Sequence, residues 1–244
     1  MAHRGVKGRW GRVLRYAFAS LLLLFTVVAT LTGVQWYWSL IGACTASLLA
    51  LGRRRIFRPG VTRTADEIIC RYIPWYEGNA YFLNVGLPLM GLAMVAAGFT
   101  PGNPAWLRYG GYVLLGVMPL ILFSVVSMWR RCSLRISPSA LTVRLAALKD
   151  GPIEIRREHV KSITPKMIPN SANGVPSLQV EIAYQPADTS TDTTKTVLLG
   201  LQLTVVPDNL VNALITWNDA THDNPRELLD RIERILMGRS MAGV

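Results

Sequence analysis

The chain has 244 residues, 26 of them Lys or Arg and 15 Asp or Glu, so its formal net charge is +11. Residues 1–129 hold 12 of the basic and 3 of the acidic residues, whereas residues 130–244 hold 14 and 12. A nucleic-acid-binding protein keeps its positive excess on a soluble domain. Because this excess flanks apolar stretches instead, we do not expect nucleic acid as a partner. The three cysteines have neither the number nor the spacing of a disulfide framework or a zinc site.

Four apolar stretches dominate the first half of the sequence. They are Leu14–Val34, Gln35–Leu51, Asn79–Phe99 and Tyr109–Trp129. A helix needs about 17–25 such residues to cross a hydrocarbon core about 30 Å thick. We therefore predict a transmembrane domain over residues 1–130 with about four membrane-spanning helices. Only a tight turn near Gly33 separates the first two stretches, so a re-entrant hairpin is the alternative for that pair.

Basic residues collect on one side of these predicted helices. They precede the first stretch, lie between the second and third, and follow the fourth, while the other two connections hold Arg108 alone. Cytoplasmic loops of membrane proteins carry such an excess of Lys and Arg. The asymmetry predicts that both termini, and the whole of residues 131–244, are cytoplasmic.

Residues 52–78 are predicted to form a cytoplasmic loop at the membrane surface. Thr64 and Glu67 have the spacing of a capping box, which would open a short helix over the following apolar residues and end it at Pro74. Arginines beside the inner leaflet attract anionic headgroups, each with about 1 kcal/mol. The candidate lipid-contacting residues are Arg53, Arg54, Arg55, Arg58, Arg130 and Arg131. The general enrichment of basic residues in cytoplasmic loops explains the same pattern without lipid specificity.

Small residues recur every four positions on two of the predicted helices. They are Gly42, Ala46 and Ala50 on the second, and Ala93 and Ala97 on the third. Small residues at this spacing let helix backbones approach closely in lipid. They could join the four helices to one another or dock them against a partner protein. Because the spans hold no acidic or histidine residue, an autonomous ion-coupled transporter is not expected.

Residues 131–244 change to the alternation of apolar and polar residues that is typical of half-buried strands. The predicted strand regions are Ser133–Ser137, Leu141–Leu145, Ile153–Arg156, Val160–Ile168 with an interruption at Pro165, Leu178–Ile182, and Thr196–Val206 with a break at Gly200. Asp150-Gly151 indicates a hairpin turn. Six or seven short antiparallel strands in a chain of this length predict an α+β domain built as a small β-sandwich or barrel.

Two amphipathic helices close the chain. The first begins at Pro207, and the second follows the N-cap residue Asn224 and ends at Gly238. A helix at this place would cover an open end of the predicted sandwich or barrel.

This half resembles the pleckstrin-homology-like (PH-like) domains that bacteria attach to membrane helices. The segments Ile136–Val143, Gly151–Ile163 and Asn224–Met237 carry the resemblance, and they cover roughly half of the domain. The resemblance implies a PH-like fold with a C-terminal capping helix. The additional predicted helix Pro207–Asn218 departs from that pattern, so the identity of the capping helix stays open.

The whole arrangement is similar to the lipid-uptake coordinator proteins that accompany mammalian-cell-entry-type lipid importers in GC-rich bacteria. The chain holds 21 Arg and 5 Lys, which agrees with a GC-rich source. The resemblance implies a non-enzymatic accessory or scaffolding subunit in the bacterial plasma membrane. Its helices and its cytoplasmic domain would dock on an integral membrane partner, the permease of a lipid transporter.

A membrane sensor that binds anionic headgroups through its PH-like domain is the alternative function. Arg156, Arg157 and Lys161 would be its contacts, although Glu154 and Glu158 interleave with them. The low net charge of residues 130–244 argues against this function.

No arrangement of residues indicates catalysis. The histidines are isolated, and no Walker loop, G-x-S-x-G or H-E-x-x-H motif occurs. A lipid-modifying enzyme would need polar groups that converge at the inner interface, and Glu77, Asn79 and Tyr81 are too few to support a mechanism. We therefore expect no enzyme activity, no cofactor and no metal.

Overall fold

The computed structural model describes residues 4–52, 54–145, 151–169, 176–186, 194–200, 202–220 and 224–239. The chain folds as two compact units. The helical unit comprises Met1–Arg55 and Glu77–Val125, and the α+β unit comprises Ile56–Tyr76 and Val126–Val244. The chain thus leaves the helical unit at Ile56 and returns to it at Glu77. A single boundary at residue 130 does not separate the two units, because the segment Ile56–Tyr76 folds with the second half of the chain.

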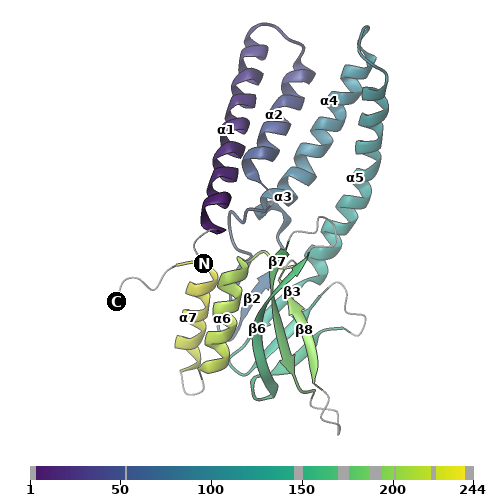
Figure 1. Ribbon diagram of the computed structural model, residues 1–244. Helices are drawn as coiled ribbons and strands as arrows, with labels where there is room; N and C mark the ends of the chain where they lie inside the picture. The colour runs from purple at the N-terminus through teal and green to yellow at the C-terminus, as the bar shows by residue number, and fades with distance from the viewer. Residues whose placement is uncertain are drawn as a thin grey trace. The chain divides into compact units, whose positions relative to one another are not determined.

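Long apolar helices make up the helical unit (Figure 1). Its elements are α1 (Arg4–Leu31), α2 (Trp36–Leu51), α3 (Gly78–Tyr81), the π-helical segment η2 (Phe82–Gly86), α4 (Leu87–Phe99) and α5 (Trp106–Arg131), the end of which continues into the α+β unit. Within the described residues, three stretches are long and apolar enough to cross a membrane: Val13–Leu31, Gly78–Phe99 and Trp106–Arg131. They correspond to three of the four predicted spans, so the prediction of a multi-pass membrane protein is confirmed.

Helix α2 is the shorter, fourth apolar helix. It has 16 residues, which at about 1.5 Å per residue is about 24 Å, less than a hydrocarbon core of about 30 Å. Gly33, with φ of +81°, lies in the turn that joins it to α1, as predicted. The two helices pack against each other, as they would either in two full spans or in a re-entrant pair.

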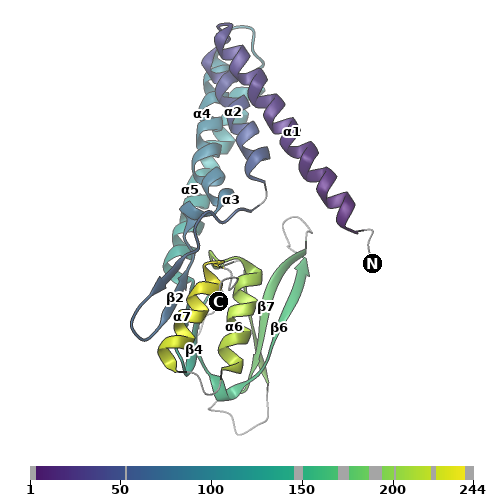
Figure 2. The ribbon, with the colours of Figure 1, turned by 90° about the vertical axis from the view of Figure 1, so that its left-hand side faces the viewer.

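The α+β unit contains two antiparallel sheets and two helices (Figures 1 and 2). A five-stranded sheet has its strands in chain order: β1 (Val61–Arg63), β2 (Ile68–Arg71), β3 (Ser133–Ile136), β4 (Ala140–Arg144) and β5 (Ile153–Arg156). A three-stranded sheet has the order β6 (Val160–Pro169), β7 (Pro176–Tyr184) and β8 (Lys195–Leu199). The helices are α6 (Pro207–Asp219) and α7 (Pro225–Leu236). The predicted combination of a helical region with an α+β domain is therefore confirmed.

The alternation read from the sequence places most of the strands correctly. Leu134 lies opposite Val143 and Leu141 lies opposite Ile155, and all four side chains are buried. The predicted strand region Thr196–Val206 is too long, because β8 ends at Leu199 and residues 202–206 form a turn before α6. The predicted interruption at Pro165 is wrong, because β6 continues through it and pairs Pro165 with Val180. In the described sheet β6 is an edge strand, where a residue without a backbone N–H is tolerated. The predicted hairpin turn at Asp150-Gly151 begins outside the described residues.

The predicted helix after Thr64 is wrong, because the segment forms the hairpin β1–β2. The backbone N–H and Oγ1 of Thr64 both donate hydrogen bonds to the carbonyl of Glu67, at 2.9 and 3.1 Å, and so close a turn between the strands. The side chains of Ile68 and Cys70 are fully buried while Arg71 is exposed, which is the period of a strand. β2 pairs with β3, and this long-range pairing outweighs the local helix signal.

A second set of contacts fixes the same segment to the chain just after β8. The carbonyl of Thr204 accepts a hydrogen bond from the backbone N–H of Gly60 at 2.7 Å. The Oγ1 atom of the buried Thr204 accepts another from the N–H of Ile73 at 2.6 Å. Residues 56–76 are thus an integral part of the α+β unit.

One hydrophobic core joins the two sheets and both helices of this unit. Trp217 of α6 is its largest fully buried side chain, and its Nε1 donates a hydrogen bond to the carbonyl of Ser137 at 2.7 Å. Helix α6 packs on β6, β7 and α7. Both helices cover apolar strand faces, as their amphipathic sequences predict.

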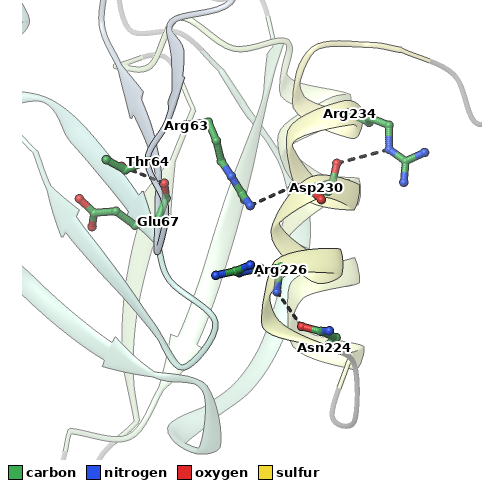
Figure 3. Close-up of polar contacts among 7 residues, drawn as sticks. All are labelled: Arg63, Thr64, Glu67, Asn224, Arg226, Asp230 and Arg234. Carbon is green, nitrogen blue, oxygen red and sulfur yellow. Dashed lines mark hydrogen bonds and ion pairs between the residues drawn. The ribbon is translucent and has the colours of Figure 1, made fainter.

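Helix α7 is held at its start and along its side (Figure 3). The side chain of Asn224 accepts a hydrogen bond from the backbone N–H of Arg226 at 3.2 Å, which confirms the predicted N-cap. Arg63 of β1 donates to Asp230 of α7 at 2.9 Å. The hairpin β1–β2 therefore reaches the last helix of the chain as well as the sheet. Gly238, with φ of +68°, follows the helix end.

Candidate membrane-interface site

Basic side chains of the helical unit gather where three segments meet. The segments are the first turns of the apolar part of α1, the linker after α2, and the start of α3. By sequence the unit holds nine basic residues and one acidic residue, Glu77. All of the basic residues except Arg108 lie in the first two segments or before them. This basic cluster is the candidate site.

Glu77 is buried beside an arginine. Its Oε1 atom lies 2.7 Å from Nη2 of Arg54, and the two side chains are 8% and 21% exposed. Burial raises the pKa of the Glu77 carboxyl above its ordinary value, and the neighbouring Arg54 charge and hydrogen bond oppose that rise. The backbone N–H of Gly78 donates to the carbonyl of Arg55 at 2.6 Å. Together these contacts fasten the linker after α2 to the start of α3, so the pair has a structural use.

Two further arginines approach one aromatic ring. Cζ of Arg15 lies 5.1 Å from the ring centroid of Tyr16, and Cζ of Arg55 lies 5.3 Å from the same centroid. Nη2 of Arg15 also donates to the hydroxyl of Tyr16 at 3.3 Å. A Cβ atom at Gly52 would lie 2.6 Å from Nη1 of Arg15, so the guanidinium packs directly on the backbone at the end of α2. This arrangement can bind an anion, because guanidinium groups donate paired hydrogen bonds to phosphate or carboxylate.

The predicted lipid-contacting arginines do not all belong to one unit. Arg54 and Arg55 belong to the helical unit, whereas Arg58, Arg130 and Arg131 belong to the α+β unit. Arg58 stacks on Tyr76 at 5.9 Å, and Arg130 and Arg131 are exposed in the last turn of α5. Arg53 lies outside the described residues.

Arg15 is absent from the lipid-contacting residues predicted from sequence, and the structure brings it into the cluster. Arg15 lies near the start of the first apolar stretch. A basic residue at the end of a membrane helix is expected from topology alone, so there was no reason to select it as a lipid contact. Its neighbour Tyr16 is the sequence feature that could have identified it, because aromatic and basic residues mark helix ends at a membrane interface.

The predicted small-residue positions lie between helices of this chain. A Cβ atom at Gly42 would lie 2.5 Å from Oγ1 of Thr26 in α1. Ala46 and Ala50 line a groove of about 140 Å³ between α2 and α1. Ala93 and Ala97 are fully buried in a cluster whose other buried members are Tyr37 of α2 and Leu107 of α5. These five residues thus serve internal helix packing, and a role for them in binding a partner stays a prediction.

The cations proposed for headgroup binding by the α+β unit are engaged within that unit. Arg157 stacks on Trp217 at 5.6 Å and donates to the carbonyl of Asn218 at 3.3 Å. Lys161 donates to Oγ1 of Thr194 at 3.2 Å, and Arg156 lies 3.8 Å from a carboxylate oxygen of Glu158. Arg156 and Arg157 border an open, mixed-charge groove of about 740 Å³ together with two glutamates. Because arginines and glutamates line this groove together, it has no net preference for an anionic membrane surface.

The polar groups of the described residues form no metal-type cluster. No group of three or more His, Cys, Asp or Glu residues converges in that part of the chain. His159 lies 3.4 Å from Glu158 at the surface. The candidate site is therefore the basic cluster of the helical unit.

Comparison with known proteins adds no relative: no family model matches the chain, and neither the curated proteins nor the solved structures give a significant match.

Proposed function

We propose that the chain is a non-enzymatic accessory subunit of a larger complex in the bacterial plasma membrane, and that this complex transports lipid. Its helices would dock on the permease, and its α+β unit would bind another subunit from the cytoplasm. The resemblance to PH-like membrane proteins and to lipid-uptake coordinators supports the proposal. The contacts of Glu77, Arg157 and Lys161 support it as well, because each of these side chains binds a group within its own unit.

The uncovered face of α5 is the observation that carries the docking proposal. Val113, Leu120 and Phe123 are exposed on it, and nothing lies within 4 Å of a Cβ atom placed at Gly116. A glycine on an apolar face allows another helix to approach closely in lipid. The five small residues predicted from sequence lie between helices of this chain. Gly116, in contrast, packs against no other helix in the described part of the chain.

Co-purification tests this role. The chain, isolated at native abundance in mild detergent, should carry a stoichiometric integral membrane partner. Gly116→Leu should release that partner without changing the melting temperature of the isolated chain, because no neighbouring atom obstructs the new side chain. Gly11→Leu, at a glycine of α1 that is also uncovered and is not among the glycines with positive φ, is the control that should retain it. A wild-type chain that purifies alone would refute the proposal.

The proposed orientation, with both termini in the cytoplasm, needs a separate test. All three native cysteines are buried, so an introduced thiol reports its own position. A membrane-impermeant maleimide should label Ala105→Cys, before α5, in intact cells. It should label Asp208→Cys, in α6, only after the cells are permeabilised. The reverse pattern would overturn the orientation and the assigned role of the α+β unit.

A further inference from the structure

The strongest unexplained feature of the molecule is the pair of guanidinium groups at Tyr16. Arg15 reaches the ring from its own helix, and Arg55 reaches it from the linker after α2. Both guanidinium carbons lie within 5.3 Å of the same ring centroid, so they are at most about 10 Å apart, roughly a Debye length, and they repel each other. An opposite charge nearby would relieve this repulsion.

The helical unit does not supply that charge from its own sequence. Glu77 is its only acidic residue, and Glu77 binds Arg54 at 2.7 Å. Arg15 and Arg55 therefore have no carboxylate within their unit. An anion that relieves their repulsion would come from outside the unit.

The site also holds an unused donor, next to a ring and a second guanidinium group that are exposed. Nε of Arg15 is buried and makes no hydrogen bond among the described residues. A buried donor without an acceptor costs free energy, which a small shift of the Arg15 side chain toward a bound oxygen atom would recover. Arg55 and Tyr16 are exposed, so the ring and the second guanidinium remain open to a ligand.

The position in the chain identifies the source of the anion. Arg15 is the third residue of the candidate span Val13–Leu31, so it lies within one turn of the edge of the apolar stretch. Side chains at such a depth extend toward the headgroups, where lipid phosphates lie. Guanidinium groups match phosphate oxygens with paired hydrogen bonds.

We propose that Arg15, Arg55 and Tyr16 form a binding site for the phosphate group of an anionic phospholipid. Arg15 and Arg55 contact the phosphate oxygens, and Tyr16 holds both guanidinium groups in place. This site is independent of the accessory role, since it requires only the membrane around the helical unit.

Lipid binding to the full chain in mild detergent tests the site. Native mass spectrometry measures the apparent binding constant for phosphatidylglycerol and for phosphatidylcholine with the same acyl chains. Arg15→Gln and Arg55→Gln should each weaken phosphatidylglycerol binding about fivefold, and the double variant about 25-fold. Phosphatidylcholine carries the same phosphate with a compensating choline charge, so its binding should weaken less than that of phosphatidylglycerol.

Arg108→Gln is the matched control. Arg108 stacks on Phe99 and Tyr109, each at 5.2 Å, but it is a single cation and should leave the binding constant unchanged. An equal loss in this variant would mean that net charge alone attracts the lipid, which would overturn the site. Wild-type affinity in the double variant would overturn it as well.

Two measurements distinguish lipid binding from binding of a free phosphate and from unfolding of a variant. Water-soluble glycerol phosphate should bind far more weakly than phosphatidylglycerol at the same concentration, and equal binding would assign the site to a free phosphate and overturn the lipid ligand. The melting temperature in phosphatidylcholine shows whether each variant is folded. Because the Arg55 side chain is exposed, Arg55→Gln alone decides the outcome if Arg15→Gln unfolds the chain.

Discussion

The helical unit and the α+β unit use the same residue types in opposite ways. In the α+β unit Trp217 and Leu134 are 0% exposed, whereas in the helical unit Phe123 and Leu31 are 76% and 82% exposed. Exposing such side chains to water costs about 1.5–3 kcal/mol each, a cost that hydrocarbon surroundings remove. The difference shows that the two units are built for different solvents, and it sets different rules for what each tolerates.

The two units also differ in the size of the side chains that fill their cores. The α+β unit is held by a large core of aliphatic side chains with Trp217 among them. The buried cluster of the helical unit consists of Tyr37, Leu107 and two alanines. Removing volume should therefore damage the α+β unit, and adding volume should damage the helical unit.

The largest expected effect is the loss of the core tryptophan. Trp217→Ala should destabilise the α+β unit by about 3–5 kcal/mol, because it leaves a cavity and removes the partner of the Ser137 carbonyl. Denaturant-dependent labelling of the buried Cys70 and Cys132 in a Cys44→Ser background measures this. Burial raises the pKa of Cys70 to about 12, so its thiol reacts only after unfolding. Trp75→Ala, at an exposed tryptophan of the same unit, should change stability by less than about 0.5 kcal/mol.

A second substitution tests the assignment of residues 56–76 to the α+β unit. Ile68→Ala should cost about 2–5 kcal/mol in the same labelling assay, because Ile68 is fully buried between strands of the five-stranded sheet. Thr62→Ala, an exposed position of the same hairpin, is the control. Unchanged labelling in Ile68→Ala would mean that the segment is a surface loop and not a part of this core.

Two glycines of α5 test the packing of the helical unit. A Cβ atom at Gly111 would lie 2.7 Å from the carbonyl oxygen of Gly91, whereas at Gly116 it would meet nothing within 4 Å. Gly111→Val should therefore destabilise the unit by about 1–3 kcal/mol. Gly116→Val introduces the same side chain and should have little effect. Melting of the purified chain in detergent, followed by tryptophan fluorescence, compares them, and equal melting temperatures would refute the close approach of α4 and α5.

The smallest expected effect is the pH dependence from Glu77. Because burial raises the pKa of this carboxyl in the folded chain, the folded state binds more protons between the unfolded pKa of about 4.3 and the higher folded value. The contribution of Glu77 to stability is therefore greatest below about pH 4.3 and falls as the pH rises through the folded pKa. Glu77→Gln should remove this part of the pH dependence, measured as the melting temperature between about pH 4 and about pH 8. A pH profile equal to that of the wild type would contradict the assignment.

Local patterns were sufficient for much of this fold. Uninterrupted apolar length identified three spans, alternation identified the strands that follow α5, and Asn224 with Pro225 identified the start of α7. Each of these signals is carried by neighbouring residues, so no knowledge of distant partners was needed.

The failures at the segment 56–76 and at Arg15 have one physical cause. The segment at Ile68 has local helix signals, yet it becomes a strand because β3, more than sixty residues later, offers backbone partners and a buried face. Arg15 and Arg55 are separated by a whole helical hairpin, so their convergence on Tyr16 could not be read from spacing. The membrane character of the chain and the types of most other elements follow from local chemistry. The membership of residues 56–76 in the α+β unit and the pairing of two arginines arise from long-range packing, which is decided only when the whole chain has folded.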